Sequence, residues 1–212
     1  MAFHSRSGLF RGGFVKDCID AGHLAIGMEG SDYSKIHRRA EWITIPDYLF
    51  TCDVTGDFDI WVDVGQGAER LQFDVVTAWE MIEHIAEEDI DRVADNVSRH
   101  LKPGGLWIMS VSPKEETIDG VRTHQTVKPR EWWIEKFHKL GFIHKEDYVR
   151  YFNTQFVRGP KYGGPGSFHL VLTQNEGRMP AIPMGSLKAY LLDRWLGSNL
   201  QRLLRTLVVG FE

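Results

Sequence analysis

The fold class of this chain is decided by residues 73–85, which read FDVVTAWEMIEHI. The stretch opens on an apolar run, which predicts a buried strand over 73–78. A helix over 90–100 and a second strand over 106–111 follow it. A strand, a helix and another strand in succession are typical of a parallel pair with the helix packed on the sheet.

The same alternation continues on both sides of this stretch. Upstream, the sequence predicts a helix over 12–21, a strand over 24–28, a helix from residue 31 or 32 to about 42, a strand over 48–52 and a hairpin or loop over 58–63. Downstream, it predicts a turn at 102–105, a helix over 129–140 and strands over 142–152 and 167–173. The last two strands have no helix between them, so we expect them to pair antiparallel at one edge. The whole pattern predicts an α/β fold with a doubly wound, mostly parallel sheet.

Composition and charge exclude several other classes of protein. The 212 residues carry 25 basic and 29 acidic side chains, a net charge of −4, which argues against nucleic acid as a partner. Cys18 and Cys52 form no Cys-x-x-Cys motif, so no metal site is predicted, and two reduced thiols indicate a cytoplasmic protein. The apolar runs of the sequence are too short for a membrane span.

The chain is predicted to divide into a main domain over 1–178 and a helical extension over 179–212. Leucines and Trp195 in the extension predict an amphipathic helix, and arginines give it a basic side. We expect this helix to pack on its own domain or to form a homodimer with a second copy of the chain. Binding to a membrane surface or to another partner is the alternative.

Polar residues and glycines stand where a ligand is expected. In an open parallel sheet, ligands bind beyond the carboxyl ends of the strands. Glu29 ends one strand, and its two carboxylate oxygens match two ribose hydroxyls, although an exposed cap carboxylate has the same signature. Asp53 ends the next strand and either accepts from an adenine amino group or forms a turn before Gly56. Gly8 and Gly12 precede the first helix, where glycine lets a ligand approach the backbone or marks a plain turn.

Together these features resemble the class I S-adenosylmethionine-dependent methyltransferases, especially the branch that acts on small molecules. The most specific segments are 73–85 and 101–105 with its following strand, and residues 22–34 and 132–142 extend the similarity. The resemblance implies a seven-stranded sheet that binds S-adenosylmethionine across the strand ends.

The resemblance also implies which residues bind this cofactor. They lie at strand ends or in the loops after them: Gly8, Gly12, Glu29, Gly30, Ser31, Asp53, Val54, Ala78 and Trp79. Glu29 would hold the ribose, with Ser31 and Asp32 beside it. Asp53 and Val54 would frame the adenine, whereas Ala78 and Trp79 would lie along the methionine part.

The start of the chain departs from the family pattern. The family opens with a strand that ends in an acid, followed by a Gly-x-Gly-x-Gly loop. Residues 6–12 read RSGLFRG, with Arg6 at the acid position and Phe10 at the middle glycine. We therefore expect the first strand to be shortened or missing, with residues 1–5 as a stub.

The predicted activity is methyl transfer from S-adenosylmethionine to an oxygen or nitrogen of a small-molecule or sugar acceptor. His124 follows the strand at 106–111, where the acceptor would lie, and is the first candidate for a general base, with His84 second. A structural histidine is the alternative for each. The altered first loop motivates a second hypothesis, a catalytically impaired scaffold or binding protein with the same fold.

Two further activities are disfavoured. The sequence contains no Tyr-x-x-x-Lys pair, which argues against a nicotinamide oxidoreductase. Trp79-Glu80-Met81 follows the strand at 73–78, where amino-group DNA methyltransferases carry a proline-rich motif that reaches a flipped base.

Overall fold

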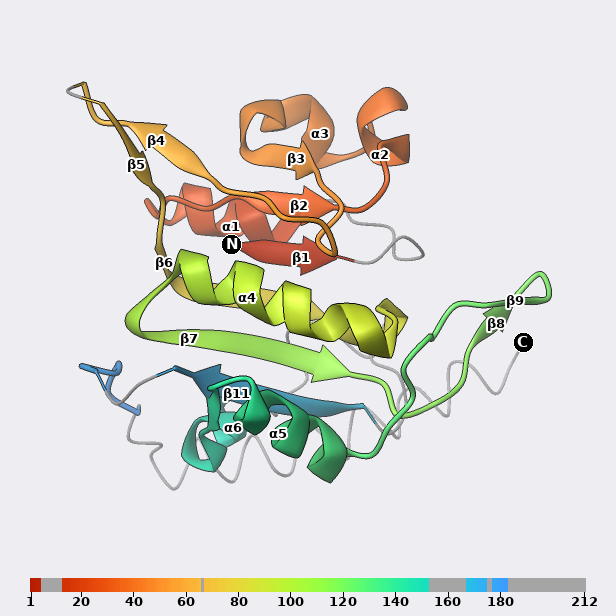
Figure 1. The fold of residues 1–212 in the computed structure, drawn as a ribbon. Coiled ribbons are helices and arrows are strands. Elements are labelled where there is room, and N and C mark those ends of the chain that lie inside the picture. Colours follow the sequence, from red (N-terminus) through yellow and green to blue (C-terminus); the bar gives the residue numbers. More distant parts are fainter. Residues whose placement is uncertain (5–12, 66, 153–166, 175–176, 183–212) are drawn as a thin grey trace, which may run out of the picture.

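The computed structural model of the chain describes residues 1–4, 13–65, 67–152, 167–174 and 177–182. A seven-stranded sheet runs through this part (Figure 1), in the order β10 (Ile143–His144), β11 (Phe168–Thr173), β7 (Leu101–Val111), β6 (Phe73–Trp79), β1 (Ala2–His4), β2 (Gly27–Glu29) and β3 (Leu49–Thr51). Neighbours from β7 to β3 are parallel, whereas β11 is antiparallel to both β7 and β10. The predicted mostly parallel sheet with an antiparallel edge is confirmed.

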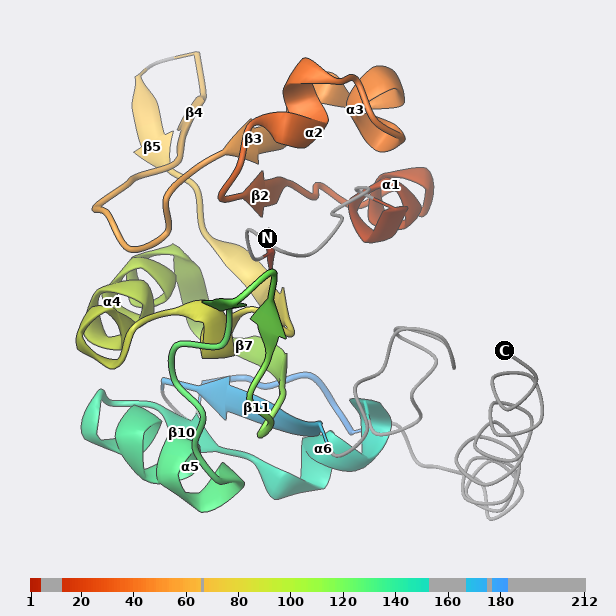
Figure 2. The ribbon, with the colours of Figure 1, turned by 90° about the vertical axis from the view of Figure 1, so that its right-hand side faces the viewer.

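Helices cover both faces of this sheet. They are α1 (Gly13–Asp20), α2 (Tyr33–Ile36), α3 (Glu41–Thr44), α4 (Ile90–His100), α5 (Arg130–Lys139) and α6 (Glu146–Phe152), with short 3₁₀ turns at Pro46–Tyr48, Ile82–His84 and Glu87–Asp89. Figure 2 shows α4 and α5 on one face of the sheet and α1 and α6 on the other. The doubly wound arrangement is therefore confirmed.

The sheet separates two apolar layers, because successive side chains of a strand point to opposite faces. On the side of α4 and α5, Ala78 and Trp107 are fully buried. Trp107 meets the rings of Phe137 and Phe142 at centroid distances of 4.9 and 5.2 Å. On the opposite side, Trp79 is buried with side chains of β7, β11 and α6.

The first strand is short but lies at the centre of the sheet, between β2 and β6. The backbone N–H of Thr77 donates to the carbonyl of Met1 at 2.7 Å, and the Met1 amine donates to the carbonyl of Val75 at 3.0 Å. Burial lowers the pKa of this amine to about 5. The stub predicted at residues 1–5 is present as a strand over Ala2–His4. Its three residues bridge β2 and β6, so backbone groups that would be costly to bury unpaired find partners.

The helix predicted from residue 31 or 32 to about 42 is wrong, because α2 and α3 replace it. Between them, Arg38 and Ala40 have φ angles of 46° and 44°, a left-handed conformation that interrupts a right-handed helix. The strand predicted over 24–28 is also too early, since β2 begins only at Gly27.

The strand predicted over 142–152 is wrong beyond its first residues. Pairing of β10 with β11 ends at His144, and the chain then turns into α6. Val149 of this helix is buried with Trp79 and Val171 on the sheet. This tertiary contact outweighs the strand preference of the aromatic and β-branched residues in α6.

The turn predicted at 102–105 lies inside β7 as a bulge. Phe73 pairs with Leu101 and Val75 with Leu106, so the residues between Leu101 and Leu106 interrupt the ladder. Gly104 allows this course with a φ of 77°. The hairpin or loop predicted over 58–63 corresponds to the hairpin of β4 (Trp61–Asp63) and β5 (Ala68–Arg70).

Some predictions lie outside the described residues. Gly8 and Gly12 fall in 5–12, and nearly all of the C-terminal extension falls in 183–212. The two-part division of the chain and the homodimer through its last helix thus stay predictions. In the described ranges, none of the helices combines the length and the apolar character that crossing a membrane requires.

Candidate functional site

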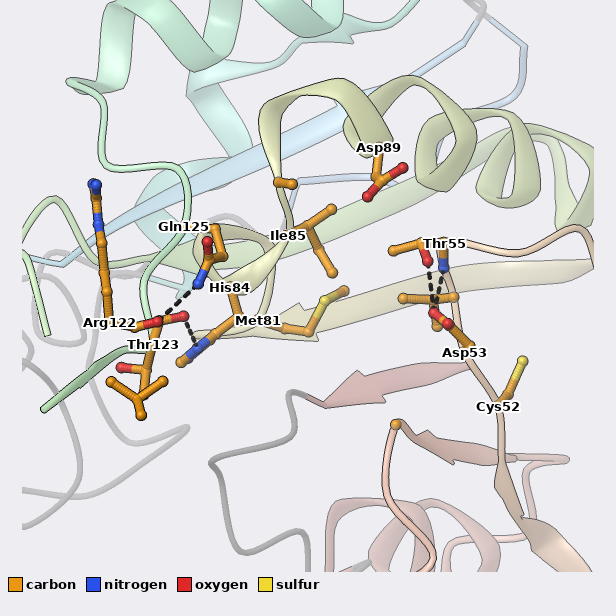
Figure 3. A pocket seen from close by; sticks show the side chains of 14 residues that line it. Cys52, Asp53, Thr55, Met81, His84, Ile85, Asp89, Arg122, Thr123 and Gln125 are labelled. Atoms are coloured by element: carbon orange, nitrogen blue, oxygen red, sulfur yellow. Dashed lines mark hydrogen bonds between the residues drawn. The ribbon is translucent and has the colours of Figure 1, made fainter. Parts of the chain in front are cut away.

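A cavity of about 500 Å³ lies at the carboxyl ends of β2, β3 and β6. This volume is in the range of small-molecule pockets. The lining comes from Gly30, from residues 52–55 after β3, from residues within 81–89 after β6 and from residues within 121–125. Figure 3 shows polar side chains at two ends of the cavity, with Met81 and Ile85 between them. Four predicted site residues thus share one cavity: Gly30, Asp53, Val54 and His84.

Glu29 is the last residue of β2 and directly precedes Gly30 of the lining. Its side chain is only 3% exposed, so it is not an exposed cap carboxylate. The Ser34 hydroxyl donates to its Oε1 at 3.1 Å, whereas its buried Oε2 has no hydrogen-bond partner among the described residues. Burial raises the pKa of this carboxyl. The Ser34 hydroxyl, the Trp42 indole and the positive charge of Arg39 lower it by less. Buried hydrogen-bond acceptors nearly always have a partner, so an acceptor without one in the protein indicates that a ligand supplies the donor.

Asp53 lines the cavity and also forms a local turn. Its Oδ1 accepts hydrogen bonds from the backbone N–H and the hydroxyl of Thr55, at 3.0 and 2.7 Å (Figure 3). The two alternatives for Asp53, a turn residue and a ligand contact, are therefore compatible, because the turn itself holds the carboxylate at the cavity wall. The thiol of Cys52, which is half-buried and not in a disulfide, lies beside it in the lining.

The loop after β3 is held in place from α4. The side-chain amide of Asn96 donates to the carbonyls of Val54 and Gly56, at 3.0 and 2.8 Å. Asn96 is fully buried. Sequence analysis missed this residue, because an asparagine in a helix carries no local signal that it reaches a distant loop.

His84 lines the other end of the cavity, and His124 packs against it. Their rings meet edge to face, with centroids 4.6 Å apart. Nδ1 of His84 lies 2.9 Å from the carbonyl of Thr123, and Nδ1 of His124 lies 2.5 Å from the carbonyl of Lys114. Because a carbonyl oxygen can only accept, each neutral ring carries its proton on Nδ1 and presents a lone pair at Nε2. The structure thus brings both predicted base candidates together.

A buried carboxylate joins the loops that carry these histidines. Glu83 is fully buried, and its Oε1 accepts from the backbone N–H of Ser112 at 2.9 Å. The carbonyl of the same residue accepts from the N–H of Thr126 at 3.0 Å. Glu83 therefore ties the segment after β6 to the segments before and after His124.

A small hairpin adds polar groups at the histidine end. Its strands β8 (Thr117–Ile118) and β9 (Val121–Arg122) project beyond the carboxyl ends of the central strands (Figure 1). Arg122 donates through Nε to the carbonyl of His124, and Gln125 donates through its amide to the carbonyl of Arg122, both at 2.8 Å. Sequence analysis missed this hairpin because strands of two residues leave no recognisable alternation.

Other predicted cofactor residues do not line the cavity. Ala78 is fully buried, and Trp79 is 6% exposed with its ring 6.2 Å from that of His169. The Ser31 hydroxyl accepts the N–H of Tyr33 at 3.2 Å, at the start of α2. Contacts of Ala78, Trp79 and Ser31 with a cofactor stay predictions.

Residues 49–107 match a family model described as a methyltransferase domain. Solved structures share the fold, among them an S-adenosylmethionine-dependent methyltransferase from Mesorhizobium loti, with 14% identity, coverage of 81% of this chain and 88% of that chain, and a TM-score of 0.51. The chain therefore has the fold of an S-adenosylmethionine-dependent methyltransferase. The glycopeptide N-methyltransferase MtfA is similar at 15% identity, with 84% and 83% of the two chains covered and a TM-score of 0.51. DhpI, solved in complex with SAH, is similar at 15% identity, with 81% and 74% covered and a TM-score of 0.51.

The segment that matches the family model runs from the start of β3 into β7. It contains Asp53, Val54 and His84, whereas Glu29 and His124 lie outside it. No sequence relative is found among curated proteins. The family match therefore includes the central residues of the site. Glu29 and His124 lie before and after the matched segment, and the fold brings them to the same region.

Proposed function

We propose that the chain is an S-adenosylmethionine-dependent methyltransferase that acts on an oxygen or nitrogen of a small-molecule or sugar acceptor. The observation that carries this proposal is the buried Oε2 of Glu29, an acceptor without a partner among the described residues, beside the cavity. A ribose offers two adjacent hydroxyl donors to such a carboxylate. Proteins of this fold include the SAH complex of DhpI and the S-adenosylmethionine complex of MtfA.

The residues at the Glu29 end of the cavity fit this cofactor. Glu29 would accept hydrogen bonds from the ribose, and Asp53 would accept one from the adenine amino group. Val54 would pack against the adenine ring, and Gly30 would leave room for the backbone to approach the ligand. When bound, S-adenosylmethionine supplies an electrophilic methyl group on a sulfonium sulfur.

The acceptor would bind at the opposite end, where His84 lines the cavity. A hydroxyl acceptor must lose a proton as its oxygen bonds to the methyl carbon, and the Nε2 lone pair of His84 can take that proton. An unprotonated amine needs no base before attack. His124 would hold the ring of His84 in place, and Arg122 and Gln125 would orient polar groups of the acceptor. Positioning of the two reactants would supply most of the rate enhancement.

Calorimetric titration of the folded chain with S-adenosylmethionine tests this proposal. We expect micromolar binding that weakens at least about tenfold in Glu29→Ala, the loss of a hydrogen bond to a charged group. Asp47→Ala is the matched control, because Asp47 is an exposed acid outside the cavity lining. Absence of binding by the folded chain would overturn the proposal.

The second candidate function is a scaffold or binding protein that does not transfer methyl groups. Arg6 and Phe10, which depart from the family pattern of an acid and a glycine, favour it. The same titration separates the two functions, because a scaffold without the cofactor site would show no binding that depends on Glu29.

A further inference from the structure

Two histidines and a glutamate gather where three loops meet beside the cavity. His84 comes from the 3₁₀ turn after β6, Glu116 from the residue before β8, and His124 from the segment after β9. One ligand atom from each side chain lies within 4.8 Å of the others. Neither local spacing nor the family match brings these residues together.

Both imidazoles are prepared to donate a lone pair at this cluster. The carbonyl of Thr123 accepts from Nδ1 of His84, and the carbonyl of Lys114 accepts from Nδ1 of His124. The Nε2 atoms therefore present lone pairs. Histidines that bind metals nearly always donate their other ring N–H to a carbonyl or carboxylate, which sets the tautomer and orients the ring.

Glu116 supplies negative charge to the same cluster. Its Oε2 lies 3.5 Å from Nε2 of His124 and accepts from the hydroxyl of Thr123 at 2.8 Å. A tetrahedral zinc with bonds of about 2.1 Å places its ligand atoms about 3.4 Å apart, so this pair is already near the required separation. The Glu116 side chain is 46% exposed, so it can move to bring its carboxylate closer to the ligand atom of His84.

The nearby cation does not oppose a metal directly. Arg122 donates through Nε to the carbonyl of His124, and its terminal nitrogen lies 3.8 Å from the carboxylate of Glu115. Its guanidinium is thus paired with a carbonyl and with a neighbouring acid.

We propose that His84, Glu116 and His124 bind a divalent transition-metal ion of the zinc type at the cavity wall. Two imidazoles and one carboxylate are a three-ligand set that leaves a coordination position for a water or a substrate oxygen. His84 lines the cavity, so that position is within reach of an acceptor.

The metal would define the acceptor class, a step that rests on the proposed function. A metal-bound acceptor hydroxyl has a lowered pKa and releases its proton to water. Its oxygen then bonds to the methyl carbon as the carbon–sulfur bond of the sulfonium breaks, which leaves a neutral thioether and no change of oxidation state. The metal would thereby replace His84 as the group that activates an oxygen acceptor.

Zinc titration of the chain against a chromophoric chelator tests the site without any cofactor or acceptor. We expect one tightly bound zinc, with affinity reduced at least about tenfold in Glu116→Gln and in His124→Ala. Glu131→Gln and His138→Ala are matched controls at exposed residues outside the cluster and should bind as the unchanged chain does. Because Glu116 is exposed at the surface, Glu116→Gln remains informative even where His124→Ala fails to fold.

Absence of zinc binding would overturn the site, and so would equal binding by Glu116→Gln and the unchanged chain. Failure of the proposed function is distinguishable, because it appears in the S-adenosylmethionine titration. Zinc binding without cofactor binding would support the metal site and overturn its role in methyl transfer. Cofactor binding without zinc binding would overturn the metal site alone.

Discussion

The rings of His84 and His124 meet edge to face at 87°, with their centroids 4.6 Å apart, although they belong to separate loops. A backbone carbonyl accepts a hydrogen bond from each of the two Nδ1 atoms. The pair is therefore a positioned source of lone pairs at one end of the cavity, whereas Asp53 lines the other end. This separation is what a reaction between a cofactor and an acceptor requires.

The neutral forms of His84 and His124 are expected to carry the proton on Nδ1, because each Nδ1 faces a carbonyl. Long-range proton–nitrogen correlation spectra of the ¹⁵N-histidine-labelled chain distinguish this tautomer from the Nε2 form. His84→Gln and His124→Gln assign the two signals. An Nε2-protonated tautomer at either residue would contradict the geometry.

Glu29→Gln is expected to weaken S-adenosylmethionine binding while it leaves the unliganded protein at least as stable. Burial raises the pKa of Glu29, so at neutral pH the unfolded state ionises more readily than the folded state. The ionised side chain thus costs folding free energy, and that cost grows as pH rises through the folded pKa. The amide removes this cost, but also removes the charged acceptor.

Thermal unfolding and calorimetry at pH 7 check both parts of the Glu29→Gln prediction. Asp47→Asn is the control, since it changes an exposed acid outside the cavity lining. A melting temperature clearly below that of the unchanged chain, or an undiminished cofactor affinity, would be evidence against the assignment of Glu29.

Asn96→Ala is expected to destabilise the chain by about 2 kcal/mol, because the carbonyls of Val54 and Gly56 lose their buried donor. The loop after β3, which lines the cavity, would no longer be fixed to α4, so cofactor affinity should also fall. Urea unfolding and calorimetry measure the two effects. Asp95→Ala, an exposed neighbour on α4, should change neither, and a change of similar size there would refute the argument.

His100 is expected to make the chain less stable as the pH falls below about 6.5. Burial lowers its pKa, aided by Arg99 and Arg70 and opposed by the Asn96 carbonyl and Asp59. Nε2 of the neutral ring accepts the N–H of Ile60 at 3.0 Å, a hydrogen bond that protonation removes. With a folded pKa below the unfolded one, the unfolded state binds the proton first, and stability is full only above the unfolded pKa.

Urea unfolding between pH 5 and 8 checks the His100 prediction. His100→Gln should lose less stability over this range than the unchanged chain does, whatever its absolute stability. His23→Gln, at an exposed histidine, should keep the full dependence. Parallel pH curves for His100→Gln and the unchanged chain would contradict the prediction.

Gly104→Ala is expected to cost more stability than Gly141→Ala, although both glycines have left-handed φ angles of 77° and 85°. That conformation alone costs about 1–2 kcal/mol for an alanine. At Gly104 the added Cβ would also lie 3.0 Å from the carbonyl oxygen of Arg178, whereas nothing lies within 4 Å at Gly141. Equal losses in thermal unfolding would show that the segment at Arg178 does not pack on the bulge.

Local sequence patterns predicted the elements that bury continuous apolar runs. The strand at β6, the second half of β7 and the helix at α4 were predicted correctly, because each carries its own hydrophobic pattern. The segment at α6 was wrongly predicted as a strand, because its aromatic and β-branched residues are typical of strands. In the structure Val149 packs on the sheet as part of a helix. Arg38 and Ala40 show the same limit, because their left-handed backbone has no glycine to signal it.

The sequence by itself determined the alternation of strands and helices, the antiparallel edge, and the placement of Glu29, Asp53 and Val54 at strand ends. Those features depend on short-range periodicity and on the rule that ligands bind at carboxyl ends. Only the tertiary structure brought His84, Glu116 and His124 together and reached from Asn96 to the loop after β3. Such contacts depend on the paths of loops between distant elements, and loops carry no repeating pattern from which those paths can be predicted.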